Sequence, residues 1–499
     1  MSNRLAVEPR TLPNSDLVGD CPLLPVWTEL PIEGTDPVQL LGLLAADGPG
    51  VLLESLDLSG RSGGYTIVAG DPAGILVGDR DGLRLESVRR PLPIAAGRLA
   101  PEGSALLASL KEVAMALKAP AVPGVPTMAG GLAGLFSYEA AGLLDGLAFP
   151  AGRGLPPAPP VVLLVLDRVV VLDHDRDRMV LVTHVPARAG AEAARPALAE
   201  LLAAVAGARS PHRPIPSGTA GTLAVAPNVT AEMFRAGVKR IKEDIAAGEI
   251  YQAVLSRRLS APAQESGLAI YERLRRVNPS PAMFYLRLPG VELAGSSPEP
   301  LVKVLGTRVS SRPIAGTRRR GRDQHEDERL AAELATDPKE RAEHAMLVDL
   351  ARNDLGKVCR PGSVHPTDLM SLQRFPRVMH LVSNVEGELA EGKTALDALG
   401  ATFPAGTVTG APKRRAMEII AREEPSARGP YAGAAGYLTF SGDLEFCITI
   451  RTAVVAQGQV HVQSGAGVVT DSDPDQELAE TEAKASAILA ALTVPRTRR

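Results

Sequence analysis

Two pairs of glutamates have a spacing that could hold a divalent cation. Glu340 and Glu343 lie three residues apart in a stretch with helical periodicity, and Glu477 and Glu480 repeat this arrangement near the end of the sequence. Residues three apart on a helix share a face, so each pair would present two carboxylates together. Carboxylate oxygens suit Mg²⁺, which keeps its remaining positions for water or for a substrate carboxylate. Either pair alone fits an ordinary exposed helix equally well, because glutamate is mostly found at the surface.

Other residues could supply acid–base chemistry. Glu299 follows an apolar segment and Pro298, a position where a carboxyl group can be held as a general acid. His380 is a lone histidine in an apolar strand pattern, which usually indicates a core residue. Residues 403–413 form a Pro/Gly-rich loop that leads into a helix predicted over 412–422, where backbone N–H groups and basic residues could bind an anion. Turn chemistry alone explains such a loop better.

The elements that must position these residues mix strands and helices without a regular strand–helix–strand rhythm. The pattern predicts an α+β fold with mostly antiparallel sheets. A Gly-Ala-Gly segment, 465–467, is expected to follow the strand 459–463 and to allow close backbone approach. The other main elements expected are helices over 36–46, 105–117, 191–205 and 230–247 and strands over 50–55, 65–69, 130–136, 161–171, 179–185 and 251–259.

Composition narrows the class of protein. The chain has 499 residues, 45% hydrophobic and 22% charged, with a net charge of −3, so nothing favours a nucleic-acid partner. Three scattered cysteines, Cys21, Cys359 and Cys447, indicate reduced thiols in a cytoplasmic protein. No signal peptide or membrane span is expected. The Pro/Gly/Ser-rich stretch 208–222 predicts a boundary between an N-terminal region, 1–222, and a second region, 223–499.

Taken together and in order, the motifs of the second region resemble the chorismate-utilising enzymes. The resemblance covers essentially residues 230–492, and its motif set is most similar to the large subunits of anthranilate synthase. It rests on the segments Tyr-Gln-Ala-Val-Leu-Ser at 251–256, Ser-Pro-Glu at 297–299, Pro-Ile-Ala-Gly-Thr at 313–317, the helix at 340–354, the loop at 404–413, Arg-Gly-Pro-Tyr at 428–431, Ile-Arg-Thr at 450–452 and Glu-x-x-Glu-Thr-x-x-Lys-Ala at 477–485.

The resemblance implies a fold, a metal and a substrate site. The expected fold is two mostly antiparallel sheets packed as a sandwich with helices outside. Mg²⁺ would join a chorismate carboxylate to four metal ligands, Glu340, Glu343, Glu477 and Glu480. The residues implied to bind chorismate itself are Gly316, Thr317, Tyr431, Arg451, Gly465, Ala466 and Gly467.

Position 252 distinguishes the nucleophile within this family. Relatives that add water to the ring have a lysine there as general base, whereas this chain has Gln252, which can orient ammonia but cannot take a proton. By resemblance, Glu299 would protonate the departing 4-hydroxyl group. His380 and Thr407 match positions associated with the elimination of pyruvate. The implied reaction converts chorismate and ammonia to anthranilate and pyruvate through 2-amino-2-deoxyisochorismate.

Alternative activities remain open at this point. An enzyme that stops at 2-amino-2-deoxyisochorismate is a close rival, against which the presence of His380 and Thr407 argues. Aminodeoxychorismate synthases of the folate branch usually have lysine where this chain has Ala315. A non-catalytic scaffolding homologue would be expected to lack one of the metal carboxylates, Glu299 or Arg451, and all are present.

The resemblance also implies partners. No glutamine amidotransferase module is visible, so a separate subunit of that class is expected to supply ammonia, in an assembly compatible with the heterotetramer typical of the family. The residues matching the tryptophan-inhibition pocket of the family are Glu54, Ser55, Pro281 and Met283. Ala282 replaces the aromatic residue usual in that pocket, so inhibition by tryptophan is expected to be weakened.

Overall fold

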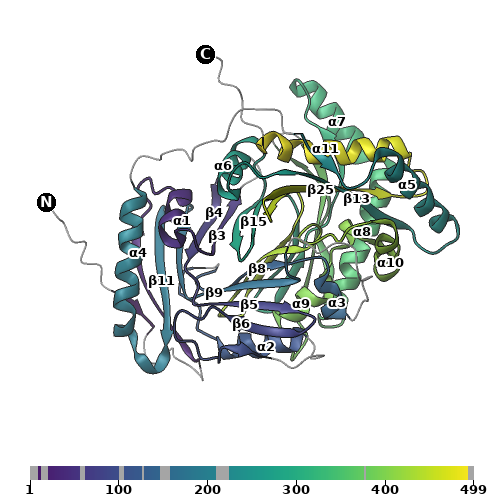
Figure 1. Ribbon diagram of the computed structural model, residues 1–499. Coiled ribbons are helices and arrows are strands. Elements are labelled where there is room, and N and C mark those ends of the chain that lie inside the picture. The colour runs from purple at the N-terminus through teal and green to yellow at the C-terminus, as the bar shows by residue number, and fades with distance from the viewer. Residues whose placement is uncertain are drawn as a thin grey trace, which may run out of the picture.

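The computed structural model describes residues 9–12, 21–56, 62–99, 106–125, 128–145, 158–209, 224–375 and 378–492. Within them, two large sheets form, and every strand pairing between their members is antiparallel. Helices lie outside the sheets (Figure 1), so the predicted α+β class is confirmed. The boundary predicted at residues 222 and 223 falls outside the described residues.

The first sheet has 13 strands. Its order is β1 (Arg10–Thr11), β2 (Leu23–Pro31), β11 (Arg178–Pro186), β10 (Arg168–Asp173), β4 (Ser62–Gly70), β3 (Gly50–Leu56), β14 (Ala282–Leu288), β15 (Val291–Ser297), β24 (Thr452–Ala456), β25 (Gln459–Val468), β13 (Gln252–Pro262) and β12 (Ala226–Pro227), with β21 (Gly410–Ala411) also paired to β13.

The second sheet has 12 strands. Its order is β18 (Ile314–Arg319), β20 (Val378–Glu388), β17 (Arg308–Ser311), β16 (Pro300–Leu305), β23 (Leu444–Ile448), β22 (Ala434–Thr439), β8 (Gly131–Phe136), β9 (Val161–Leu166), β5 (Gly74–Asp79), β6 (Gly82–Glu86) and β7 (Gly97–Arg98), with β19 (His365–Arg374) also paired to β20.

Helices cover the outer faces of both sheets (Figure 1). Most of them begin at a recognisable cap: Asp36, for example, accepts hydrogen bonds from the backbone of Val38 and Gln39 at the start of α1. The helices are α1 (Pro37–Ala45), α2 (Leu106–Ala116), α3 (Ala140–Asp145), α4 (Arg195–Ala208), α5 (Ala231–Ala246), α6 (Gly267–Val277), α7 (Gln324–Thr336), α8 (Pro338–Gly356), α9 (Ala395–Thr402), α10 (Lys413–Glu423) and α11 (Pro474–Leu492). Among the described residues, no helix combines the length and the apolar character that a membrane crossing requires.

The sheets pack face to face over one apolar core. Phe284 and Leu286 of β14 meet Val162 and Leu164 of β9 in this layer, where all four side chains are buried. One further core lies between the second sheet and its helices, and another lies between the first sheet and its helices. Alternate residues of a strand therefore enter different cores, which explains why so many strands are apolar on both faces.

Strands from both ends of the chain are interleaved in each sheet. β3 pairs with β14 in the first sheet, so that Glu54 lies opposite Met283, and β8 pairs with β22 in the second. The residues before and after the predicted boundary therefore build the same two sheets.

One predicted strand is wrong. Residues 161–171 read as a single apolar strand, but the structure divides them into β9 and β10 at Asp167, and these two strands belong to different sheets. Arg90 holds this crossing point: its Nε lies 2.8 Å from Asp167 Oδ2, and its Nη1 lies 2.5 Å from Asp71 Oδ2. Because both halves are fully buried, hydropathy alone could not reveal the change of sheet.

Two smaller corrections concern element ends. Gly465, Ala466 and Gly467 lie inside β25 rather than after it. Pro412 is the residue before the first turn of α10, not its first helical residue. The three cysteines are free thiols, as predicted.

Candidate active site

The antiparallel pair β13–β25 forms one wall of the candidate site. Gly465 lies opposite Ser256, and Gly467 lies opposite Val254. A Cβ atom on Gly465 would lie 2.7 Å from the Tyr431 hydroxyl oxygen, and one on Gly467 would lie 2.6 Å from Gln252 Nε2. The missing side chains therefore make room for a phenol and a carboxamide on one face of the sheet. Ala466 is buried and points to the opposite face.

Glu299 follows β15 and is buried in apolar surroundings. Burial raises the pKa of its carboxyl group to about 8, while the Thr407 hydroxyl and the positive charge of Lys484 oppose the rise. Leu301, Leu347 and Ile448 share with Glu299 and Thr407 the lining of a cavity of about 40 Å³. A carboxyl group in this setting holds its proton near neutral pH, as a general acid must.

Thr407 lies on a short 3-10 helix, η3 (Gly406–Val408). Its hydroxyl oxygen is buried, faces Glu299, and lacks a hydrogen bond of regular geometry to any described residue. A buried polar atom left in this state is costly, which favours a role towards a ligand. The structure thus places two predicted catalytic residues side by side.

His380 lies on β20 beside the neighbouring strand β18, which carries Gly316 and Thr317. Its Nδ1 is 2.8 Å from the Gly316 carbonyl oxygen and 3.1 Å from Thr317 Oγ1. A carbonyl can only accept, so Nδ1 carries the proton and Nε2 is left as the basic nitrogen of the neutral ring. Burial lowers the pKa of His380, as do the positive charges of Arg451 and Lys484, while the bond to Gly316 opposes this shift.

Gly316 has a backbone conformation that favours glycine, with φ +66°. It sits at an irregularity in the β18–β20 ladder, and a Cβ atom there would lie 3.1 Å from Glu340 Oε2. Gly316, implied to bind chorismate, and Glu340, the first implied metal ligand, are therefore direct neighbours.

Arg451 is one of the residues implied to bind chorismate. It directly precedes β24 and its φ is +51°, an uncommon value for a residue with a side chain. Burial lowers the pKa of its guanidinium group, and the Tyr431 hydroxyl and Glu480 oppose this. Burial also raises the pKa of the Tyr431 phenol, to about 12, so it remains a hydrogen-bond donor.

The four predicted metal ligands come from α8 and α11. Burial and then the negative charges of Glu340 and Glu480 raise the pKa of Glu343. Burial also raises the pKa of Glu477, with Glu480 adding to the shift. These carboxylates repel one another across the two helices, and a divalent cation would relieve that repulsion.

The donor set fits a magnesium ion in chemistry, but two of its members, Glu340 and Glu480, are bound to basic side chains. Glu340 accepts a hydrogen bond from Arg318 at 2.8 Å, and Glu480 is paired with Lys484 at 2.5 Å. Within the described part of the chain, no three acidic, histidine or cysteine side chains are already gathered closely enough to hold a metal.

Lys484 belongs to the Glu-x-x-Glu-Thr-x-x-Lys-Ala motif, but the sequence alone predicts no role for it. Its Nζ donates to the Gly465 carbonyl oxygen at 3.0 Å, and its charge acts on Glu299, Glu343, His380 and Glu477. It lies one helical turn after Glu480, and this spacing was the signal that could have identified it.

The basic cluster after the Pro/Gly loop is occupied by acids. Lys413 binds Asp354 at 2.7 Å, and Arg415 binds Glu249 at 2.9 Å. The turn interpretation of this loop is therefore the better one, and its importance for the site comes from Thr407.

The four residues matched to an inhibitor pocket meet at the ends of β3 and β14. Glu54 is buried and accepts hydrogen bonds from Tyr271 Oη at 2.5 Å and Arg275 Nη2 at 2.7 Å. Ser55 lies opposite Ala282 and Glu54 opposite Met283, while the Pro281 carbonyl accepts from the Leu56 amide. The structure brings these residues together beside the end of β15, where Ser297, two residues before Glu299, lies opposite Ala282.

Known proteins place this arrangement in a family. The family model described as chorismate binding enzyme matches residues 88–490. Anthranilate synthase component 1 of Streptomyces coelicolor is 44% identical over 481 residues, covering 94% of this chain and 89% of the relative. The corresponding protein of Mycolicibacterium smegmatis is 39% identical, covering 95% and 92%.

Solved structures agree with this placement. Anthranilate synthase component I from Streptococcus pneumoniae superposes with a TM-score of 0.74 at 32% identity, covering 85% of this chain and 92% of that one. The menaquinone-specific isochorismate synthase from Escherichia coli shares the fold alone, with a TM-score of 0.69 at 20% identity and coverage of 96% and 97%. This chain belongs to the chorismate-binding enzymes, in the branch of anthranilate synthase component 1.

Proposed function

We propose that the chain is the lyase that converts chorismate and ammonia to anthranilate and pyruvate, through 2-amino-2-deoxyisochorismate, at the start of tryptophan synthesis. The observation that carries this proposal is the neutral carboxamide of Gln252 in the place where water-adding relatives have a lysine. It lies against Gly467 on the wall that also holds Gly465 and the Tyr431 hydroxyl. Ammonia attacks without a general base, so an orienting amide is sufficient there.

The first step needs an acid for the leaving hydroxyl group. Glu299 supports this role, because burial gives its carboxyl group a pKa of about 8 and keeps it protonated at neutral pH. Thr407 would orient the carboxyl group or the departing oxygen. Arg451 and the Tyr431 phenol would hold the enolpyruvyl carboxylate.

The second step removes the C2 proton and expels pyruvate. His380 supports the role of base, because its Nδ1 proton is held by the Gly316 carbonyl and its lowered pKa keeps Nε2 free. Gly316 and Thr317 would line the ring beside this base.

Glu340, Glu343, Glu477 and Glu480 would hold Mg²⁺, which supplies charge neutralisation for the ring carboxylate and so favours loss of the 4-hydroxyl group. Lys484 would then be released from Glu480 and remain on the Gly465 carbonyl. A glutamine amidotransferase subunit would supply ammonia, in a heterotetramer, and tryptophan would inhibit through the region of Glu54 and Met283.

Product analysis tests the proposal. The purified chain is incubated with chorismate, Mg²⁺ and an ammonium salt at alkaline pH, with a control lacking ammonium, and products are separated by chromatography and identified by mass. Anthranilate and pyruvate in equal amounts, dependent on ammonium, are the expected result. Accumulation of 2-amino-2-deoxyisochorismate, a C4-aminated product, or no turnover would each overturn it.

A further inference from the structure

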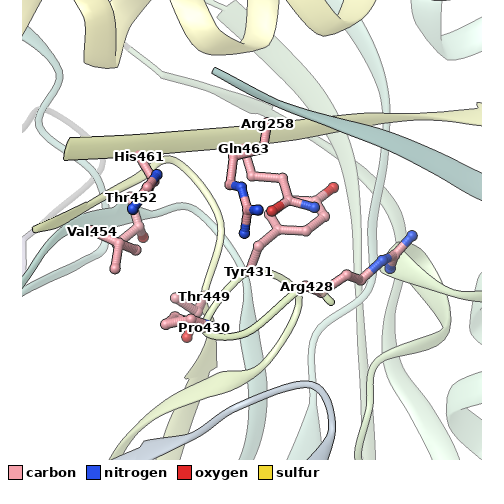
Figure 2. A pocket seen from close by; sticks show the side chains of 9 residues that line it. All are labelled: Arg258, Arg428, Pro430, Tyr431, Thr449, Thr452, Val454, His461 and Gln463. Carbon is pink, nitrogen blue, oxygen red and sulfur yellow. The ribbon is translucent and has the colours of Figure 1, made fainter. Parts of the chain in front are cut away.

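A small cavity lies beside the candidate site, with Tyr431 in its lining. Figure 2 shows Arg258 and Gln463 descending from the β13–β25 pair towards the Tyr431 ring, with His461 and Thr452 to one side. Its volume of about 10 Å³ holds one molecule of the size of water. The cavity is therefore too small for chorismate or any part of its ring.

Strand register places this cavity on the same face as the site. Arg258 lies opposite Gln463, and the next pair along this face is Ser256 opposite Gly465. The following pair is Val254 opposite Gly467, which contacts the Gln252 side chain. Residues two apart on a strand share a face, so the cavity and Gln252 are joined along one strip about 13 Å long.

Two polar side chains that line the cavity have few or no partners among the described residues. Thr449 is fully buried, and its hydroxyl has no hydrogen-bond partner there. Arg258 makes no ion pair among the described side chains; its Nη1 reaches only the Ala427 carbonyl, at 3.4 Å. Glu139 and Glu424 act on Arg258 at longer range, but Glu424 is bound to Arg428 and neither acid lines the cavity.

These groups distinguish neutral ammonia from the ammonium ion. An arginine N–H can donate to the lone pair of ammonia, whereas ammonium has no lone pair and carries a like charge. The N–H groups of ammonia can in turn donate to the Thr449 hydroxyl oxygen. His461, held by Ser260 at 2.8 Å, adds no positive charge, because burial and the charge of Arg258 lower its pKa to about 4.

We propose that this cavity is a holding site for neutral ammonia, in which Arg258 and Thr449 bind the nucleophile and exclude its cation before it moves past Gly465 to Gln252. The proposal rests on the proposed function, since it specifies how the second substrate of that reaction is held. It assigns binding roles to two residues that the proposed function leaves without one.

Steady-state kinetics of the whole chain test the role of Arg258. Ammonium chloride is varied at fixed pH and saturating chorismate, then chorismate is varied at fixed ammonium. R258M is expected to raise the KM for free ammonia about tenfold, because a hydrogen bond from a charged donor is lost, and to leave the KM for chorismate within about twofold. The matched control is R257M, a neighbour on the opposite face of β13 that binds Glu482 at 3.2 Å instead.

Enlarging the cavity gives a second, independent test. Val454 lines the cavity opposite His461, while Val462 is also buried but lies on the other face of β25. V454A removes two methyl groups and should admit methylamine, offered as its chloride salt, so that N-methylanthranilate appears by mass spectrometry. The wild type and V462A should form at least tenfold less of it relative to anthranilate.

The outcomes separate this inference from the proposed function. If the wild type makes no anthranilate from ammonium, the proposed function fails. If it does, but R258M and R257M show the same KM for ammonia and V454A forms no more N-methylanthranilate than V462A, only the holding site is overturned.

Discussion

Glu54 and Glu299 are both buried glutamates, but their surroundings treat the negative charge in opposite ways. Glu54 is bound by the Arg275 guanidinium and the Tyr271 hydroxyl, so its charge is compensated inside the fold. Glu299 forms no ion pair with any described residue, and burial raises its pKa to about 8. The contrast separates a carboxylate that ties two elements together from a carboxyl group that can deliver a proton.

The largest expected effect comes from removing the proton carried by Glu299. E299Q keeps the shape of the side chain but cannot protonate a leaving group, so we expect kcat for anthranilate formation to fall by about 10²–10⁴. The fluorescence of anthranilate measures this loss, and circular dichroism checks the fold. E54Q is the comparison: its turnover per folded molecule should stay within a few fold. An E299Q enzyme as active as wild type would remove Glu299 from the mechanism.

The second prediction removes the cation that binds Glu54, so that this buried carboxylate lacks an ion pair among the described residues, as Glu299 does. R275M leaves the charge of Glu54 buried without its cation. We expect a loss of about 2–3 kcal/mol in the free energy of unfolding, less than for a fully buried pair because Arg275 is partly exposed. Urea denaturation measures it. The double variant E54Q/R275M should recover much of the loss, and a double variant as unstable as R275M would mean that packing, not charge, dominates.

A third prediction extends the comparison to the carboxylates of α8 and α11, whose mutual repulsion a metal would relieve. Chelation of Mg²⁺ should abolish anthranilate formation. E343Q should raise the Mg²⁺ concentration needed for half-maximal activity on the order of tenfold, because the affinity of such sites follows the number of ligand charges. Titration of activity with MgCl₂ measures this. E328Q, on the exposed side of α7, is the control, and equal Mg²⁺ requirements in the two variants would contradict the assignment.

The smallest expected effect is a pH dependence of kcat/KM for chorismate, which Glu299 should produce and Glu54 should not. Because burial raises the pKa of Glu299 to about 8, the acid form dominates below that pH and is lost above it. At constant free ammonia, kcat/KM for chorismate should fall about threefold between about pH 7.5 and about pH 8.5. His380 adds no second limb there, since its lowered pKa keeps it neutral. A flat profile over this range would show that proton delivery by Glu299 does not limit the reaction.

Local sequence patterns predicted many of the helices and strands, but they could not show which residues far apart in the sequence contact one another. The helical spacing of Glu340 and Glu343 is a property of neighbours in the chain, and α8 has it. The pairing of Glu54 with Tyr271 joins residues 217 positions apart, which no spacing can show. The change of sheet at Asp167 was hidden for a related reason, because the arginine that holds it lies 77 residues away.

For the candidate site, sequence motifs identified the residues, whereas only the packed structure shows the environment of each side chain. Its residues were named by resemblance, and the structure adds their surroundings: burial raises the pKa of Glu299, the Gly316 carbonyl fixes the tautomer of His380, and the Thr407 hydroxyl is buried facing Glu299. Lys484 was overlooked because its importance comes from the distant groups that its charge affects, which are Glu343 on α8, Glu477 on α11 and His380 on β20.

The interleaving of both sheets has a consequence for how the chain could be divided. A cut between residues 209 and 224 would leave two fragments, each holding only part of both sheets and exposing long unpaired strand edges such as β3 without β14 and β8 without β22. Each fragment alone should aggregate, because such edges pair with any available strand. Produced together, the same two fragments should assemble into one active molecule. The chain is therefore suited to a fragment-complementation experiment.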